Sequence, residues 1–425
     1  MFKELDIRGK YPSEINEEKM FLLGKAVSKK EEGIIAGMDF RKNNGALLKS
    51  FSYGFQKDML FLGAVPTPLV AYSSVGFGMM LTASHNPADY SGAKFFRKGT
   101  YITKDEMQGI KKEYEKIENE LKDGKKHPKE ERPLKYNINS ESAKEHFDNY
   151  LDSIQEINSG IFDLAGGAVC GLKELFPKSI FNAPDPEFKL HSPEPKEDTL
   201  IDLRKLTIKD RKLGFAFDGD GDRLQICDSG KLIEGDITAA FVCEYHLKRG
   251  DAIVLSVDCR QEVFEKVSDL GIKAITSKVG DAYVVEKALK VGAIFSAERS
   301  GHFTFYNHSS NSDGIYAAAA LSTHENGEFL EFSQQFKNVT IKEEIWHKVD
   351  FDKLKELLEE GTRKLAPTKI ETIDGIKAIF EDFTLLVRQS TTEPKVRINS
   401  EGEDMQKAKE GMRFAKELVS KTKIH

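Results

Sequence analysis

Cysteine and tryptophan are scarce in this chain, which has four cysteines and one tryptophan among 425 residues. The cysteines are Cys170, Cys227, Cys243 and Cys259, and no two of them form a Cys-x-x-Cys pair. A disulfide framework or a cysteine-based zinc site needs regular, closer spacing, so neither is expected. We therefore expect reduced, buried thiols and a cytoplasmic protein.

Long apolar runs and excess positive charge are also missing. No stretch approaches the roughly 18 apolar residues that span a bilayer, and the first ten residues, MFKELDIRGK, lack the apolar core of a signal peptide. The formal net charge is −6, which argues against electrostatic binding to nucleic acid or anionic membranes. We expect small-molecule partners, with no nucleic acid and no membrane.

Several catalytic and nucleotide-binding motifs do not occur. The absence of G-x-x-x-x-G-K-S/T and of G-x-G-x-x-G argues against a P-loop or a dinucleotide site. The absence of H-E-x-x-H argues against a zinc protease, and that of G-x-S-x-G against an α/β-hydrolase.

Short apolar runs that end in polar or glycine-rich loops recur along the chain. Examples are GIIAGMDF (33–40), GFGMMLTAS (76–84), KLGFAFDGDGD (212–222) and DAIVLSVD (251–258). Helix-length amphipathic stretches lie between several of them. This alternation predicts an α/β fold with largely parallel sheets, in which ligands bind at loops after the carboxyl ends of strands.

Changes in composition predict the domain boundaries. Residues 104–135 are rich in Lys and Glu, which is typical of a solvated helix followed by a linker. Further boundaries are expected near 236 and near 335–345, before a segment of α+β texture. The predicted domains are 1–137, 138–236, 237–337 and 338–425.

The loop DGDGDR (218–223) predicts a metal site. Asp218, Asp220 and Asp222 have period 2, so an extended backbone places them on one side, and the intervening glycines allow them to converge. Three adjacent carboxylates repel one another unless a cation neutralises them, and oxygen ligands suit Mg²⁺. An EF-hand is excluded, because Arg223 and Ser229 replace its essential Gly and Glu. A solvated acidic turn is disfavoured by the apolar FAF before the loop.

Ser84, in TASHNP, admits two interpretations. It is either a nucleophile, or a structural residue in a turn or at a helix N-cap, since Ser before Asn-Pro is common at such positions. A serine hydrolase needs a correctly placed base, and the ring of the adjacent His85 is expected to point away from Ser84. The stretch alone does not choose.

Two further loops concentrate polar groups. AERSGH (297–302) combines a carboxylate, a hydroxyl and His302, which suits a polyhydroxylated ligand and proton exchange; a satisfied structural histidine is the alternative. RQSTTEPKVRI (388–398) interleaves hydroxyls with cations, which favours phosphate binding over a solvated charged face. Its candidate ligands are Arg388, Ser390, Thr391, Thr392, Lys395 and Arg397.

In this order and at these spacings, the loops resemble the α-D-phosphohexomutase family, which includes phosphomannomutase/phosphoglucomutase and phosphoglucosamine mutase. The resemblance spans nearly the whole chain. It rests on DIRGKYP (6–12), VPTP (65–68), TASHNP (82–87), DGDGDR (218–223), ERSGH (298–302) and the R-x-S-x-T-E-P loop (388–394). The family fold implies three α/β domains with mixed sheets and a smaller α+β C-terminal domain around a central cleft.

The resemblance implies that Ser84 carries a phosphoryl group and donates it. The enzyme would then interconvert hexose 6-phosphate and hexose 1-phosphate, of mannose or glucose, through a hexose 1,6-bisphosphate that also acts as activator. One Mg²⁺ per active site would be held by Asp218, Asp220, Asp222 and the phosphate on Ser84. We expect a monomer or a homodimer.

The resemblance also implies roles for other residues. Charge on the transferring group would be stabilised by Arg8, His85, Lys94 and Arg223. The general acid/base would be His302, Lys278 or Lys94. The sugar hydroxyls would be held by Glu298 and Ser300. The distant phosphate would be held by Arg388, Ser390, Thr391, Thr392 and Arg397.

Departures from the family's sequence pattern leave the sugar substrate undetermined, and alternative functions also have to be considered. Ser91, Ala297 and Thr391 stand where the family usually has other residues. Phosphoglucosamine mutase is the alternative within the family, and a catalytically silent sugar-phosphate-binding homologue is the non-enzymatic one. An aspartate-nucleophile phosphatase would need Thr or Val at Asp222, and it leaves Ser84 unexplained.

Overall fold

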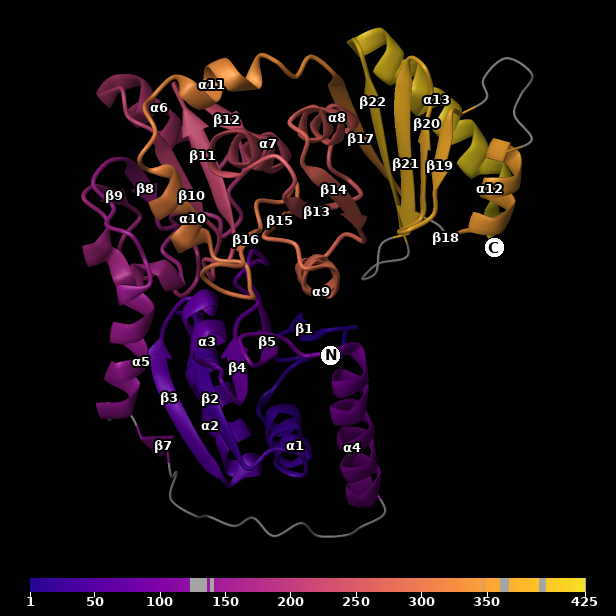
Figure 1. Cartoon of the computed structure of the whole chain (residues 1–425). Coiled ribbons are helices and arrows are strands. Elements are labelled where there is room, and N and C mark those ends of the chain that lie inside the picture. Colours follow the sequence, from indigo (N-terminus) through magenta and orange to yellow (C-terminus); the bar gives the residue numbers. More distant parts are fainter. Residues whose placement is uncertain (123–135, 138–140, 347, 360–366, 390–394, 425) are drawn as a thin grey trace. The chain divides into compact units, whose positions relative to one another are not determined.

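The chain divides into two units in the computed structural model, which describes residues 1–122, 136–137, 141–346, 348–359, 367–389 and 395–424 (Figure 1). The first unit comprises Met1–Glu234 with Gly301–Leu330, and the second comprises Gly235–Ser300 with Glu331–His425.

The first sheet of the first unit is mixed, with strand order β1-β5-β4-β2-β3-β7 and β6 beside β5. Strands β2, β3, β4 and β7 run parallel, whereas β1 and β4 pair antiparallel with β5. The strands are β1 (Asp6–Lys10), β2 (Gly33–Met38), β3 (Asp58–Ala64), β4 (Phe77–Leu81), β5 (Tyr90–Arg97), β6 (Thr100–Tyr101) and β7 (Tyr136–Asn137). All five residues of β4 are buried, as its apolar sequence predicts.

The helices around this sheet form two groups. Helix α1 packs on α2 and α4, whereas α3 packs on β2, β4 and α5. The helices are α1 (Glu17–Ser28), α2 (Asn44–Phe55), α3 (Thr67–Ser73), α4 (Lys104–Lys122) and α5 (Glu141–Asp152). The side chain of Asn16 begins α1 by accepting a hydrogen bond from the Lys19 N–H at 3.0 Å.

The charged stretch at 104–135 is more than a solvated helix. Helix α4 buries Met107, Ile110, Tyr114 and Ile117 in the core of the first sheet. Their spacing of three or four residues forms one apolar stripe, and Lys and Glu cover the remaining surface. Residues 123–135, predicted to be a linker, lie outside the described residues.

The second sheet has the order β12-β11-β10-β8-β9. Strand β10 is parallel to β8 and forms an antiparallel hairpin with β11. The strands are β8 (Ile161–Asp163), β9 (Ser179–Ile180), β10 (Gly214–Phe217), β11 (Leu224–Asp228) and β12 (Lys231–Ile233). The accompanying helices are η1 (Ala168–Leu175), a 3₁₀ helix, and α6 (Ile201–Asp210). Strand β16 (Phe303–Phe305) and α10 (Gly314–Leu321) also belong to the first unit, and α11 (Glu328–Ser333) follows.

The second unit contains a parallel sheet and an antiparallel one. In the parallel sheet, β13 (Ala252–Ser256) lies between β14 (Lys273–Ser277) and β15 (Phe295–Ala297). Its helices are α7 (Gly235–His246), α8 (Gln261–Asp269) and α9 (Asp281–Val291).

The antiparallel sheet has the order β17-β22-β21-β20-β19, and α13 packs across β22, β21 and β17. Its elements are β17 (Val339–Ile345), β19 (Lys369–Glu371), β20 (Ile376–Ile379), β21 (Phe383–Gln389), β22 (Val396–Gly402), α12 (Phe351–Glu359) and α13 (Met405–Lys421). A small ribbon pairs β18 (Lys348–Val349) with β23 (Lys423–Ile424). These sheets confirm the predicted α/β class with mixed sheets and a smaller α+β C-terminal part. No helix in the described part of the chain has the length and apolarity to cross a membrane.

Candidate active site

Ser84 lies in the turn between β4 and β5, just beyond the end of a buried strand. Its φ is 51°, an uncommon conformation for a residue with a side chain. The side chain is turned inward, and its Oγ donates a hydrogen bond to Asp218 Oδ2 at 2.7 Å. No helix begins between Ser84 and β5, so Ser84 is not a helix cap. The hydroxyl is instead fixed beside the acidic loop.

The ring of His85 does not point away from Ser84, as the sequence predicted. Its Nδ1 lies 3.2 Å from Ser84 Oγ. The left-handed turn at Ser84 reverses the backbone, which brings the two consecutive side chains together. The positive charge of Arg223, burial and the charge of Arg8 hold the pKa of His85 well below its usual range. This shift favours the neutral form of the ring beside the hydroxyl.

The three aspartates converge in the hairpin loop between β10 and β11. Each is fully buried, and one carboxylate oxygen of each lies within 4.8 Å of the other two. Gly221 allows this, because its φ is 77° and its N–H donates to Asp218 Oδ1 at 3.0 Å. A Cβ on Gly219 would lie 2.6 Å from the backbone oxygen of Ser84. Glycine at this position thus allows the serine and aspartate loops to approach.

Lys94 extends from β5 into this acidic cluster. Its Nζ donates to Asp220 Oδ2 at 2.7 Å and also contacts Asp222 Oδ2. Burial lowers the pKa of Lys94, but the surrounding carboxylates outweigh burial and raise it above its ordinary value. Burial and the neighbouring carboxylates raise the pKa of Asp218 to about 8. Burial also raises the pKa of Asp222, but Lys94 and His302 outweigh it and hold that pKa well below its usual range.

The donor atoms of this cluster fit a hard divalent cation. Asp220 Oδ1 and Asp222 Oδ1 are buried and accept no hydrogen bond of good geometry among the described residues, although His302 Nε2 lies 3.4 Å from Asp222 Oδ1. Crowding of three buried acidic groups is costly, which the raised pKa of Asp218 reflects, and a divalent cation would relieve it. Oxygen atoms of this kind are the ligands that Mg²⁺ prefers.

The predicted cationic residues of the first unit lie around the same cluster. On β1, Arg8 donates to Asn86 Oδ1 at 2.7 Å, which joins it to the serine loop. Arg223 Nε lies 4.0 Å from Asp218 Oδ2 and donates to His302 Nε2 at 3.3 Å. Although His302 ends the ERSGH segment, it lies in the first unit and contacts Arg223.

Arg41 was not among the predicted site residues, yet it holds the serine loop. Its guanidinium is buried and donates to four backbone carbonyls. The acceptors are Ser84 O at 2.7 Å, Asn86 O at 2.6 Å, Pro87 O at 2.6 Å and Tyr90 O at 3.2 Å. These four hydrogen bonds fix the path of the chain from Ser84 to Tyr90.

Asp39 anchors Arg41 from the end of β2. Its carboxylate is fully buried and accepts from Arg41 Nε at 3.1 Å, Thr82 Oγ1 at 2.7 Å and Asn44 Nδ2 at 2.6 Å. Burial raises the pKa of Asp39 even though the Arg41 charge opposes this. The signal in the sequence is an Asp-x-Arg pair directly after a buried strand.

The residues that were predicted to bind sugar hydroxyls follow β15 in the second unit. Glu298 is buried, and its Oε1 accepts from the Gly280 N–H at 2.6 Å. Ser300 Oγ donates to Glu298 Oε2 at 3.4 Å. Lys278 is exposed near the ring of Tyr283, at 5.7 Å from its centroid. The Gly280–Glu298 bond therefore joins the loop of Lys278 to that of Glu298.

The C-terminal sheet contributes Arg388, near the end of β21. Arg388 is 8% exposed, and its Nη1 lies 3.4 Å from Asp374 Oδ2. The same Asp374 oxygen accepts from the Val279 N–H at 3.2 Å, which joins this sheet to the loop of Lys278. Arg397 lies opposite Arg388 and pairs with Glu344 at 3.0 Å. The predicted ligands Ser390, Thr391 and Thr392 lie outside the described residues.

Family models match three regions of the chain. They are described as phosphoglucomutase/phosphomannomutase alpha/beta/alpha domain I (residues 1–121), alpha/beta/alpha domain III (residues 234–335) and C-terminal domain (residues 337–418). Together they include β15 and every strand of the antiparallel C-terminal sheet.

Similar proteins span almost the same length. A phosphomannomutase from Methanocaldococcus jannaschii is 32% identical, over 99% of this chain and 98% of its own. A probable phosphoglucosamine mutase from Methanocella arvoryzae is 30% identical, over 95% and 94%. A phosphoglucomutase/phosphomannomutase family protein from Burkholderia thailandensis shares the fold at a TM-score of 0.84 and 23% identity, over 98% and 96%. The chain belongs to the α-D-phosphohexomutase family.

Proposed function

We propose that this phosphohexomutase interconverts the 6-phosphate and 1-phosphate of mannose or glucose, with Ser84 carried as a phosphoserine. The family supports the reaction class, because the relatives are mutases that move a phosphoryl group within one sugar. The observation that carries the proposal is the 2.7 Å hydrogen bond from Ser84 Oγ to Asp218 Oδ2, at the edge of the acidic cluster. It puts the expected phosphoryl carrier beside the expected metal ligands.

Two phosphoryl transfers would complete the reaction. In the first, the bond between phosphorus and Ser84 Oγ breaks, while a bond forms to the free hydroxyl of the sugar phosphate, whose proton passes to a base. The resulting bisphosphate then presents its other phosphate, and the reverse transfer restores phosphoserine. Because such transfers depend on positioning and charge stabilisation, the first unit supplies fixed cations around Ser84.

The proposed magnesium ligands are Asp218, Asp220 and Asp222, together with the Ser84 phosphate. Bound Mg²⁺ would act as a Lewis acid toward the transferring phosphoryl group. Asp220 Oδ1, which is buried and accepts no hydrogen bond in the described part of the chain, supports this assignment. Lys94, Arg8 and Arg223 would add charge stabilisation, and His85 would serve as a neutral hydrogen-bonding group.

The proposed candidates for the general acid/base are His302, Lys278 and Lys94. We expect His302→Ala and Lys278→Ala, assayed separately, to distinguish them, because only loss of the residue that exchanges the proton should lower kcat by the ~10²- to 10⁴-fold that general acid–base catalysis contributes.

The second unit would hold the rest of the substrate. Glu298 and Ser300 would receive the 3- and 4-hydroxyls, which glucose and mannose share. Arg388 would bind the phosphate that is not being transferred, together with Ser390, Thr391, Thr392 and Arg397. The Arg388–Asp374 pair keeps the guanidinium in place while leaving further N–H donors for a phosphate.

We expect Arg388→Ala to raise KM by about ten- to a hundredfold while kcat changes much less. The reason is that a charge-assisted hydrogen bond to a non-reacting phosphate contributes to substrate binding in ground state and transition state alike. Steady-state kinetics with glucose 1-phosphate would measure it. Arg413→Ala, on an exposed turn of α13, is the control, and an unchanged KM in Arg388→Ala would contradict the role of Arg388.

We propose Arg41 as a positioning residue, tested by Arg41→Lys. Lysine keeps the charge beside Asp39 but cannot donate to four carbonyls at once, so the Ser84 loop should loosen. We expect kcat to fall about ten- to a hundredfold, as for a reacting group displaced by about 1 Å, with KM nearly unchanged.

A readout specific to this idea is hydrogen exchange. The amides of residues 84–90 should exchange faster in Arg41→Lys, whereas those of the C-terminal sheet should not change. Equal kcat and equal amide hydrogen exchange in the variant and the parent protein would show that the Arg41 guanidinium does not position Ser84.

The substrate is tested by a side-by-side assay of mannose, glucose and glucosamine phosphates, each with its 1,6-bisphosphate as activator. We expect the highest kcat/KM with mannose or glucose phosphates. A clear preference for glucosamine phosphates would favour the phosphoglucosamine mutase alternative, and activity with none of them would favour the silent homologue.

A further inference from the structure

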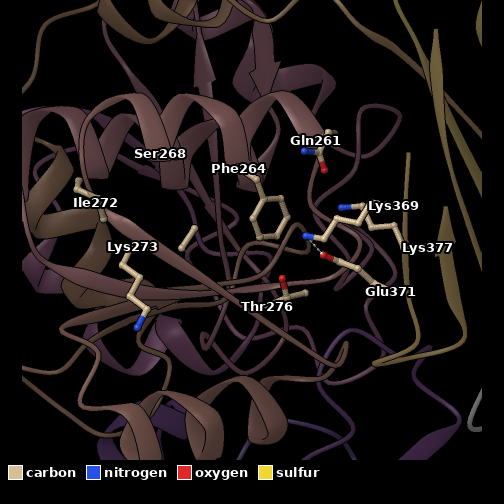
Figure 2. Close-up of a pocket in the computed structure, with 10 residues that line it drawn as sticks. Gln261, Phe264, Ser268, Ile272, Lys273, Thr276, Lys369, Glu371 and Lys377 are labelled. Carbon is tan, nitrogen blue, oxygen red and sulfur yellow. Dashed lines mark ion pairs between the residues drawn. The ribbon is translucent and has the colours of Figure 1, made fainter. Parts of the chain in front are cut away.

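A second polar cavity lies in the second unit, outside the site described above. It measures about 300 Å³ and is lined by α8 and β14 on one side and by β19 and β20 on the other. Figure 2 shows Lys369, Glu371 and Lys377 gathered at one side, with Lys273 and Ile272 at the opposite side and Phe264 between. Its size is in the range of small-molecule sites.

The lining carries excess positive charge. It includes three lysines and one glutamate, Glu371, which pairs with Lys369 at 2.6 Å. Lys273 makes no ion pair within the described residues. The cavity therefore presents two positive charges that no lining carboxylate neutralises.

Lys377 is the unusual member of this set. It is only 3% exposed, yet its ammonium makes one hydrogen bond, to Cys259 O at 3.2 Å, and lies 4.6 Å from the centroid of the Phe264 ring. An ammonium has three donors, so two remain for a ligand. Burial lowers the pKa of Lys377, as expected of a cation without a close counter-ion. A buried charge of this kind is costly unless an anion is bound.

Neutral polar groups complete the site. Gln261 borders it from the start of α8, and the hydroxyls of Ser268 and Thr276 make no hydrogen bond to the described residues. A phosphate group brings about two negative charges and three acceptor oxygens, which matches the excess charge better than a single carboxylate. Hydroxyl groups of a ligand would suit the serine and threonine.

We infer that this cavity binds a small phosphorylated metabolite, with its phosphate against Lys377 and its remaining polar groups near Ser268 and Thr276. The bound molecule would bridge the parallel sheet and the antiparallel sheet of the second unit. A hydrogen bond already joins helix α8, beside the parallel sheet, to strand β22 of the antiparallel sheet: Gln261 N–H donates to Glu401 Oε2 at 2.9 Å. A ligand at this boundary would stabilise the arrangement of the two sheets seen here.

Calorimetric titration of the full chain with inorganic phosphate tests this inference through two opposite substitutions. Lys377→Met keeps the volume and removes the buried charge, so we expect phosphate affinity at this site to fall about tenfold or more. Glu371→Gln removes the only carboxylate among the described lining residues and releases Lys369, so we expect affinity to rise about threefold. Lys409→Met, on the exposed surface of α13, is the control and should change nothing.

Crystals soaked in tungstate, a heavy phosphate analogue, would locate the anion. We expect an anomalous peak beside Lys377 that is lost in Lys377→Met. Identical phosphate titrations of Lys377→Met and Lys409→Met would overturn the inference, as would tungstate found only near the proposed active site. Because none of these residues belongs to the proposed mutase machinery, failure here would leave the proposed function untouched.

Discussion

Replacing Ser84 with alanine is expected to abolish mutase activity, with kcat falling at least about 10⁴-fold. The substitution removes the only atom that the proposed mechanism uses to carry the phosphoryl group, so no other residue can take over the transfer. The fold should survive, because a small buried hydroxyl is lost and the backbone turn is held independently by Arg41. Activity assays and thermal unfolding would measure both effects.

Intact mass adds an independent readout to this experiment. Protein purified from cells should contain a population heavier by one phosphoryl group, and Ser84→Ala should lack it. Ser73→Ala is the matched control, since Ser73 is also buried in the first unit and its hydroxyl has no hydrogen-bond partner in the described residues. Activity retained in Ser84→Ala would rule out the phosphoserine mechanism.

Asp220→Asn is expected to reduce kcat about 10³-fold while the protein stays folded. The amide keeps the size of the side chain but removes one of the three negative charges proposed to hold Mg²⁺, and loss of a Lewis acid is worth several kcal/mol at the transition state. Thr67 Oγ1 and Lys94 Nζ can still donate to the remaining carbonyl oxygen. Magnesium titration by calorimetry should show weakened binding.

The matched control for Asp220→Asn is Asp228→Asn. Asp228 is equally buried, but its carboxylate accepts from the backbone N–H groups of Gly327 and Leu330. This control should lose stability and keep magnesium binding and kcat at a permissive temperature. If Asp220→Asn behaved like Asp228→Asn, the acidic cluster would be structural and the metal assignment wrong.

Local patterns in the sequence were enough to predict that the serine and aspartate loops follow buried strands. The buried runs FGMML and GFAF predict strands β4 and β10, and loops that carry Ser84 and the aspartates follow their carboxyl ends. Period-2 carboxylates separated by glycines predict convergence, and the structure brings them within 4.8 Å of one another. These features depend on residues that are close together in the chain, and they can therefore be predicted from the sequence.

Features that depend on tertiary contacts were harder to predict. The direction of the His85 ring follows from a left-handed turn at Ser84, a conformation that serine rarely adopts. The role of Arg41 depends on four carbonyls at least 43 residues away in the chain. The division of ERSGH, with Glu298 in one unit and His302 in the other, has no signature in a continuous motif.

The most direct test of the account follows a labelled phosphoryl group. Dephosphorylated protein would be incubated with radioactive glucose 1,6-bisphosphate, digested and mapped, and a second sample would be chased with unlabelled hexose monophosphate. If Ser84 carries the phosphoryl group, the peptide that contains Ser84 should be labelled, and the label should move to the sugar during the chase. Label on an aspartate of the acidic loop, or released only as inorganic phosphate, would contradict it and indicate a phosphatase.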